Sequence, residues 1–352
     1  MDQQTLEAFA ERIYTELNTA LSYLNLYVGD RLGLFEALAE SGPTTPGELA
    51  LRTGCADRYV REWLECMAVS DYIEADPDGR RFWLSEEQRI AFVEQEHATY
   101  VGALVRFVPS VARPLEALLD AFRTGGGVPF EAYGEDAVEA IGAGNRPMYL
   151  NDLAARWMPA LPDVQARLEA GGRVADIGCG VGWSSIALAR AFPRARVDGV
   201  DIDATSIERA RRNADAAGVG GRVRFHLAAA ETAPLEGTYD LVTAFETLHD
   251  MPYPVEALAR MRALAGPRGT VLVADEAVGE TLEENRTLVG RLCYNFSVLH
   301  CLPQAMTVPG SAATGTVMRP STLRAYAREA GFARVDLLPI EHPLWRFYRL
   351  TA

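Results

Sequence analysis

The hydrophobic positions near the N-terminus predict a small helical domain that ends in a pair of short strands. Over residues 4–40, apolar side chains recur at spacings of three and four, which is the period of two amphipathic helices. Thr45 is a favourable N-cap, Pro46 suits the first position of a helix, and a further helix opens at Asp57. Two short runs within residues 72–84, on either side of the turn sequence DPDGR, predict a two-stranded wing.

The rest of the chain first continues as helix and then alternates between strand and helix. Residues 96–168 are predicted to be a helical linker with glycine breaks. From Arg173 onward, short apolar runs such as RVADIG and GTVLVADE are separated by single helices, and the last two runs predict a hairpin. This alternation predicts an α/β fold with a doubly wound, Rossmann-like sheet of seven strands, whose ligands bind at the C-terminal strand ends. The predicted domains are residues 1–95, 96–168 and 169–352, the last with a helical insertion at 280–318.

The composition excludes several classes of function. All 34 basic residues are arginine, so chemistry that needs a lysine Schiff base or the lysine of a P-loop is excluded. The formal charge of −14 repels nucleic-acid phosphates and anionic lipids. Neither an apolar run of membrane-spanning length nor a basic leader pattern occurs. We therefore expect a cytoplasmic protein without a nucleic-acid or membrane partner.

The cysteines and histidines give no metal signature. The five cysteines are scattered without a CxxC pair, and the five histidines lack the HExxH spacing. We expect reduced, mostly buried thiols and no catalytic metal.

The N-terminal order of elements resembles a winged-helix module, whose best-known use is DNA binding through its second helix. In this chain Arg58 and Arg61 of that helix lie beside Asp57, Glu62 and Glu65, so its face is not basic enough to read a DNA groove. We expect instead a module that makes a homodimer and covers part of the substrate. A ligand-sensing transcriptional regulator is the alternative hypothesis.

A glycine-rich turn follows the first predicted strand of the sheet. Gly178, Gly180 and Gly182 let the backbone approach a ligand, and the helix that follows offers free N–H groups to a carboxylate. Trp183 stands where a dinucleotide fingerprint requires another glycine. Asp201 ends the second strand, where an acid can accept both ribose hydroxyls. Together these features predict a nucleoside site without a pyrophosphate.

The strings VADIGCGVG, GVDID and YDLVTAF, with the closing hairpin, resemble class I S-adenosylmethionine-dependent methyltransferases over residues 173–352. The resemblance implies S-adenosylmethionine as the cofactor, with its methionine end at the glycine turn and its ribose at Asp201. Many members hold the adenine amine with an aspartate after the third strand, whereas Ala229 stands here, so that Glu231 or backbone atoms would substitute. The implied cofactor residues are Asp176, Gly178, Gly180, Gly182, Trp183, Asp201, Ile202, Ala230, Glu231, Phe245 and Glu246.

The sequence FETLHDMPYP follows the fourth strand and contains His249. Together with the winged helix, it is similar to small-molecule O-methyltransferases of plants and bacterial natural-product pathways, in which this histidine is the general base. An imidazole with a pKa of about 6.5 can take a hydroxyl proton at neutral pH. Asp275 or Glu276, at the end of the fifth strand, could orient the ring. Alternatively, His249 only packs at the strand end.

The insertion is similar to that of a bacterial group of winged-helix methyltransferases with mostly unassigned substrates. We expect methylation of a small, aromatic or polyketide-like hydroxyl. The alternatives on the same fold are a nitrogen or carbon acceptor, or a reaction of the cofactor without methyl transfer. The candidate substrate residues, which could equally be core residues, are Tyr23, Tyr27, Tyr294, Phe296, His300 and Met306.

Overall fold

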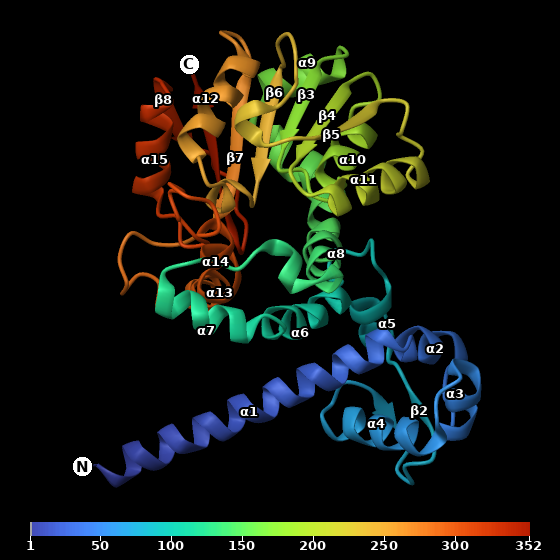
Figure 1. Ribbon diagram of the computed structural model, residues 1–352. Coiled ribbons are helices and arrows are strands. Elements are labelled where there is room, and N and C mark those ends of the chain that lie inside the picture. Colours follow the sequence, from blue (N-terminus) through green and yellow to red (C-terminus); the bar gives the residue numbers. More distant parts are fainter. Residues whose placement is uncertain (1) are drawn as a thin grey trace. The chain divides into compact units, whose positions relative to one another are not determined.

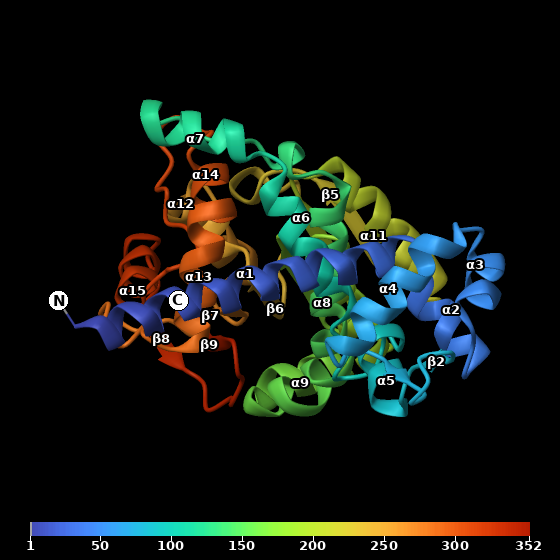
Figure 2. The same cartoon turned by 90° about the horizontal axis from the view of Figure 1, so that it is seen from below.

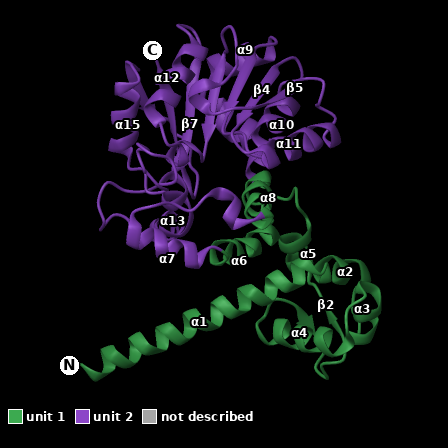
Figure 3. Cartoon of the chain, in the orientation of Figure 1, with its two compact units in different colours: residues 1–113, 135–147 green, residues 114–134, 148–352 purple. Residues whose placement is uncertain are grey.

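The computed structural model describes residues 2–352, which form two compact units (Figures 1 and 3). Unit 1 consists of the chain up to Arg113 together with Glu135–Pro147, and unit 2 consists of Pro114–Gly134 and Met148–Ala352. The segment predicted as a helical linker is therefore divided between the two units. Within the described residues, none of the helices is both long enough and apolar enough to cross a membrane.

Unit 1 has the helices and the two-stranded wing that the sequence predicts. Thr45 caps the third helix in a reciprocal capping box with Glu48, and Pro46 occupies the first helical position. The two wing strands pair antiparallel. The elements are α1 (Gln3–Arg31), α2 (Leu34–Ser41), α3 (Pro46–Thr53), α4 (Asp57–Val69), β1 (Glu74–Ala75), β2 (Phe82–Trp83), α5 (Glu86–Val93), η1 (Gly102–Arg106), α6 (Phe107–Ala112) and most of α8 (Glu135–Asn151).

Helix α1 projects beyond the other helices of unit 1 (Figures 1 and 2). Only Ser22, Leu26 and Gly29, near its C-terminal end, are buried. The apolar side chains before them lie in solvent at helical spacing, and they include Leu6, Phe9, Ile13, Leu17, Leu21 and Leu24. The apolar stripe that the sequence shows is therefore not used for packing within unit 1.

Unit 2 contains the predicted seven-stranded sheet. The strand order is β5-β4-β3-β6-β7-β9-β8, with β3 to β7 parallel and β9 antiparallel to both of its neighbours. The doubly wound fold and the closing hairpin are thus confirmed. The strands are β3 (Arg173–Ile177), β4 (Arg196–Asp201), β5 (Val223–Leu227), β6 (Leu241–Phe245), β7 (Thr270–Glu276), β8 (Arg334–Leu337) and β9 (Trp345–Thr351).

Helices cover both faces of this sheet. Successive residues of a strand point to opposite faces, so each strand packs against both layers of helices. Val174 of β3 joins a hydrophobic cluster with residues of α10 and α11, whereas Ala175 joins a second cluster with residues of α12 and α15. The helical elements of unit 2 are α7 (Leu115–Thr124), η2 (Phe130–Tyr133), η3 (Leu153–Trp157), η4 (Met158–Ala160), α9 (Pro162–Glu169), α10 (Trp183–Ala191), α11 (Ala204–Ala216), η5 (Ala230–Thr232), η6 (Leu248–Asp250), α12 (Pro254–Ala265), α13 (Leu288–Phe296), η7 (Ser297–Cys301), α14 (Leu302–Ala305) and α15 (Pro320–Glu329).

Candidate active site

The predicted cofactor and catalytic residues lie at or just after the C-terminal ends of β3, β4, β5, β6 and β7, where a parallel sheet binds its ligands. Asp176, in β3, lies beneath this edge and is almost fully buried. Its carboxylate accepts hydrogen bonds from the hydroxyls of Ser184, Ser185 and Thr243, at 2.6, 2.6 and 2.7 Å. Burial raises the pKa of Asp176, and these hydroxyls oppose that shift. Asp176 therefore ties β3 to β6 and to the start of α10.

The glycine turn needs its glycines for conformation and for space. Gly178 has a φ of +71°, and a Cβ on it would lie 2.2 Å from Oγ1 of Thr247. Gly182 has a φ of +85°, and a Cβ there would lie 2.8 Å from the ring of Phe225. Both positions lie in the left-handed region, which favours glycine. A Cβ on Gly180, by contrast, would meet no atom within 4 Å, so this part of the turn faces open space.

Asp201 connects the end of β4 to the glycine turn. Its Oδ2 accepts the backbone N–H of Gly180 at 2.8 Å, and its Oδ1 accepts that of Asp203 at 2.9 Å. Burial raises the pKa of Asp201 to about 6, although these two hydrogen bonds act in the opposite direction. A carboxylate oxygen can accept more than one hydrogen bond, so Asp201 can still receive ribose hydroxyls.

Exposed apolar side chains lie beside Asp201. Ile202, the next residue, is 71% exposed, and Leu227, which pairs with Asp201 across β4 and β5, is 54% exposed. Ala230 and Glu231 follow in η5 and are half-buried. An adenine ring needs apolar surface of this kind. The sequence analysis did not include Leu227, although its place at the end of the third strand of the sheet is a usable signal.

Aromatic side chains pack against one another next to the end of β6. Phe245 is buried and contacts Tyr149 and Trp157, with ring centroids 5.9 and 5.8 Å apart. Trp183 is half-buried at the first position of α10. Burial raises the pKa of the Tyr149 hydroxyl, and the carboxyl groups of Glu246, Asp176 and Glu276 add to the effect. Sequence reasoning missed Tyr149, because its helix lies between the winged-helix module and the first motif of the sheet and carries no motif of its own.

His249 lies in η6, directly after β6, and is 2% exposed. Its Nδ1 is 2.7 Å from Oδ1 of Asp275, which is equally buried at the end of β7. Burial lowers the pKa of His249, but the carboxylates of Asp275 and Asp250 raise it more, so the pKa lies well above its usual value. Of the two carboxylates that the sequence offered, Asp275 is the one that orients the ring.

Glu276 has a different partner. Its carboxyl group forms a hydrogen bond with Glu246, a residue with a φ of +52° just after β6. Burial, together with the charge of Glu246, raises the pKa of Glu276 well above its usual value. The raised pKa favours the neutral form of Glu276, and the two residues form a carboxyl pair rather than a support for His249.

The other ring nitrogen of His249 faces two side chains that the predicted site did not include. Nε2 is 3.4 Å from Oδ1 of Asp250, and the thiol of Cys301 forms a hydrogen bond with the ring. Cys301 comes from η7, in the insertion. The signal for Asp250 was its position next to His249, whereas nothing local pointed to Cys301.

Among the candidate substrate residues of the insertion, His300 lies nearest to this cluster. Its Nδ1 is 3.5 Å from Sγ of Cys301, and its ring contacts Tyr133 and Phe130 edge-on. Burial lowers the pKa of His300, and its Nε2 has no hydrogen-bond partner within residues 2–352. Two other candidates, Tyr294 and Phe296, are half-buried in α13, and Met306 is 38% exposed after α14.

Tyr23 and Tyr27 pack within unit 1. Both are half-buried against the hydrophobic core of that unit. The hydroxyl of Tyr27 donates a 2.6 Å hydrogen bond to Asp136, which raises the pKa of the tyrosine. Within their own unit they are core residues with one polar contact.

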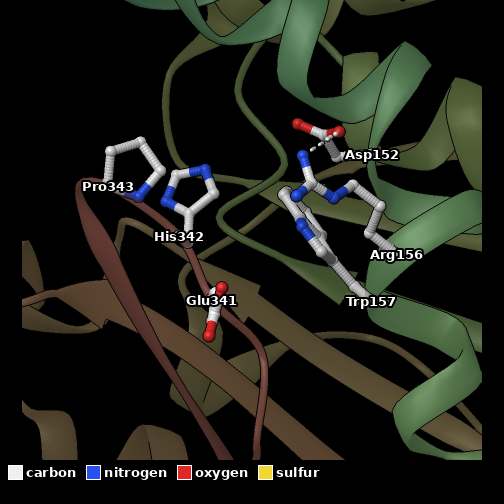
Figure 4. Close-up of a pocket in the computed structure, with 6 residues that line it drawn as sticks. All are labelled: Asp152, Arg156, Trp157, Glu341, His342 and Pro343. Carbon is white, nitrogen blue, oxygen red and sulfur yellow. Dashed lines mark hydrogen bonds and ion pairs between the residues drawn. The ribbon is translucent and has the colours of Figure 1, made fainter.

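A shallow hollow of about 300 Å³ lies elsewhere in unit 2 (Figure 4). In this hollow the His342 ring is stacked against Trp345, with centroids 5.1 Å apart. None of the predicted site residues lines it. Its lining residues are Asp152, Arg156, Trp157, Glu341, His342 and Pro343.

Comparison with known proteins identifies both parts of the chain. The family described as a methyltransferase domain matches residues 168–318, and an Rv2258c-like winged HTH domain matches residues 20–93. A ubiquinone biosynthesis O-methyltransferase of Aromatoleum aromaticum is 32% identical over 210 residues, which are 58% of this chain and 81% of that protein. The winged-helix prediction is therefore confirmed.

Solved structures share the whole fold. The mitomycin 7-O-methyltransferase has a TM-score of 0.74 at 20% identity and covers 99% of both chains. An O-methyltransferase from neocarzinostatin biosynthesis, solved with S-adenosyl-L-homocysteine and 1,4-dihydroxy-2-naphthoic acid, has a TM-score of 0.60 at 20% identity, over 94% of this chain and 96% of that one.

The residues at the sheet edge fit the cofactor of this family. Gly180 faces open space at the glycine turn, Asp201 offers a carboxylate, and Ile202 offers apolar surface. These are the chemical groups that the methionine end, the ribose and the adenine of S-adenosylmethionine require. With the matches to the methyltransferase domain and to its relative, they show that the chain belongs to the S-adenosylmethionine-dependent methyltransferases, in a form with an N-terminal winged-helix domain.

Proposed function

We propose that this methyltransferase methylates a hydroxyl oxygen of a small aromatic molecule, with His249 as the general base. The observation that carries this proposal is the buried pair of His249 Nδ1 and Asp275 Oδ1, 2.7 Å apart at the edge of the sheet where the cofactor binds. Such a pair is typical of a histidine whose other nitrogen accepts a proton during a reaction.

The acceptor hydroxyl must lose its proton as its oxygen gains the methyl group. S-adenosylmethionine supplies that methyl group on a positively charged sulfur. His249 accepts the proton at Nε2, while Asp275 holds the N–H of Nδ1, which fixes the tautomer and stabilises the imidazolium. The raised pKa of His249 brings it closer to that of a phenol, about 10 for tyrosine, which lowers the free-energy cost of the transfer.

The side chains next to this pair favour a flat acceptor. His300 lies between Cys301 and the rings of Tyr133 and Phe130, and its neutral imidazole has an unpartnered Nε2. An aromatic acceptor with a second oxygen would satisfy that nitrogen. The relatives named above are O-methyltransferases, and one of them holds a dihydroxynaphthoic acid, which supports an oxygen acceptor of this kind.

We also propose that the enzyme is a homodimer. The apolar stripe of α1, from Leu6 to Leu24, is between 41% and 60% exposed at its core-type positions. A stripe with this spacing is stabilised by packing against a partner helix. A second copy of the chain, which carries the same stripe, is a self-complementary partner.

The experiment is a methyl-transfer assay with 1,4-dihydroxy-2-naphthoic acid and simpler phenols, read as S-adenosylhomocysteine and methylated product. His249→Gln should lower kcat on the order of 100-fold or more and leave cofactor affinity unchanged. His226→Gln is the matched control, because His226 also pairs with an aspartate, Asp198, at 3.0 Å within the same sheet. Equal kcat for His249→Gln and the wild type would remove His249 from the mechanism. Cofactor binding without methylation of any phenol would contradict the hydroxyl acceptor.

A further inference from the structure

The side chains of His249, Asp250 and Cys301 bring three different donor atoms together. A ring nitrogen of His249, a carboxylate oxygen of Asp250 and Sγ of Cys301 all lie within 4.8 Å of one another, and Nδ1 of the ring is already paired with Asp275. His249 and Cys301 are buried, and Asp250 is half-buried. The donors come from η6 and η7, two segments that are separated in the chain by the strand β7 and the helices α12 and α13 and that meet only in the fold.

The distance between the nitrogen and oxygen donors matches that of two ligands on one tetrahedral ion. Zinc lies about 2.0–2.2 Å from nitrogen and oxygen ligands, so that two such ligands at a tetrahedral angle are about 3.4 Å apart. Nε2 of His249 and Oδ1 of Asp250 are 3.4 Å apart. This Oδ1 is buried and accepts no hydrogen bond among the described residues, and its contact with Nε2 is an ion pair only while the ring is protonated.

Asp275 prepares the histidine for such a ligand role. Because Oδ1 of Asp275 accepts the proton of Nδ1 at 2.7 Å, the lone pair of the neutral ring is on Nε2, which faces Asp250 and Cys301. Carboxylate, histidine and metal in this order form the usual outer support of a zinc ligand.

We propose that His249, Asp250 and Cys301 form a binding site for Zn²⁺, and that zinc inhibits the enzyme reversibly by occupying Nε2 of the base. The thiol of Cys301 loses its proton to solvent when it coordinates the ion. The inhibition rests on the proposed role of His249 in methyl transfer, whereas the metal site rests only on the three donors.

The donor set selects zinc over the common hard cations. Mg²⁺ and Ca²⁺ require oxygen ligands in numbers that this cluster does not supply, whereas a thiolate and an imidazole are preferred by Zn²⁺. Three protein ligands leave a fourth position for water. The site is therefore a weaker one than a closed four-ligand structural site, as a reversible inhibitory site requires.

The first test is metal binding to the full chain, without any acceptor. The metal-free protein is titrated with Co²⁺, which reports a thiolate ligand as a charge-transfer band in the near ultraviolet, and then with Zn²⁺ against a chromophoric chelator. The wild type should bind one ion per chain and show the band. Cys301→Ser should lose the band and bind Zn²⁺ at least about tenfold more weakly. Cys293→Ser is the matched control, because Cys293 is buried to the same extent on the adjacent helix α13 and is not in the cluster.

Two further results decide the proposal. Asp250→Asn should keep the thiolate band and still weaken zinc binding. Because Asp250 is partly exposed, this variant should fold normally, so weaker binding can be attributed to the lost ligand even if Cys301→Ser misfolds. Zinc should inhibit the wild type and Cys293→Ser equally, each relative to its own zinc-free rate, and a chelator should restore both rates. Absence of the band in the wild type, or wild-type zinc affinity in Cys301→Ser, would overturn the metal site, and binding without inhibition would overturn the regulation. If His249→Gln kept full turnover, the base assignment would fail, while the cobalt spectrum would still test the site independently.

Discussion

Replacing Asp275 with asparagine isolates the charge of the carboxylate that supports His249. Oδ1 of Asp275 accepts two hydrogen bonds, from His249 Nδ1 at 2.7 Å and from the backbone N–H of Glu276 at 3.0 Å. Oδ2 is buried without a hydrogen-bond partner among residues 2–352. An asparagine can place its amide oxygen where Oδ1 of Asp275 lies and its NH₂ group where Oδ2 lies. Asp275→Asn therefore keeps both hydrogen bonds and the tautomer of the ring, and removes only the negative charge.

The expected loss follows from the separation of the charges. With hydrogen-bonded atoms 2.7 Å apart, the centres of the carboxylate and imidazolium charges are about 4 Å apart, which corresponds to about 4 kcal/mol at an effective dielectric constant of about 20. Asp250 remains next to the ring and the amide dipole replaces part of the lost attraction, so we expect a loss of about 3–4 kcal/mol. Since about 1.4 kcal/mol changes a rate tenfold, kcat should fall about 100- to 1000-fold.

The assay is steady-state methyl transfer at saturating S-adenosylmethionine, with the cofactor affinity measured separately by calorimetry. Only kcat should change, because the imidazolium forms during the reaction and not on binding. Glu276→Gln is the matched control, because Glu276 is the adjacent buried acid and forms its hydrogen bond with Glu246 rather than with His249, and its raised pKa favours the neutral form that glutamine copies. An equal loss in both variants, or a loss below about tenfold in Asp275→Asn, would refute the reasoning.

Three other predictions concern the cofactor site and α1. Because the pKa of Asp201 is raised to about 6, its carboxylate becomes protonated as the pH falls through 6. The affinity for S-adenosylmethionine, measured by calorimetry, should therefore be constant above pH 7 and fall about tenfold per pH unit well below 6. The affinity of Asp201→Asn should show no such dependence on pH. Gly178→Ala should lower the melting temperature and abolish cofactor binding, because the new Cβ would lie 2.2 Å from Thr247 Oγ1. Gly180→Ala has open space around its Cβ, so its melting temperature should be closer to that of the wild type. Ile13→Asp should convert a dimer to a monomer in analytical ultracentrifugation without a change in the melting temperature of unit 1, and a monomeric wild type at micromolar concentration would contradict the dimer.

Most of the fold could be predicted from the sequence because its signals are local. The N-cap at Thr45 and the short apolar runs of the sheet strands each depend on a few neighbouring residues. The division into units could not be predicted in this way. Residues 114–134 belong to unit 2 through contacts with the insertion, such as the hydrogen bond from Val128 N–H to the carbonyl of Pro303 at 2.9 Å. No pattern within either segment indicates the other.

The site shows the same division between local and non-local information. His249 and the pair of acids at the end of β7 could be found from the order of strands, because parallel strands end at the same edge. The sequence could not choose between Asp275 and Glu276, since adjacent strand residues point to opposite faces and only the position of η6 decides which acid meets the ring. Cys301 was out of reach for sequence reasoning, because its contact with His249 depends on how the insertion folds back.

The carboxyl groups around His249 suit a reaction in which the site holds one positive charge both before and after methyl transfer. Several buried carboxyl groups close together cost free energy unless they are neutral or meet a positive charge. Burial and the neighbouring Glu246 raise the pKa of Glu276 and favour its neutral form, and the carboxylates that face the ring directly are those of Asp275 and Asp250. In the proposed reaction, methyl transfer to a hydroxyl would consume one positive charge at the cofactor and create one at His249. A fixed negative field next to the ring stabilises the charge where it arises, and it does so without rearrangement because Asp275 is already held by its backbone and ring partners.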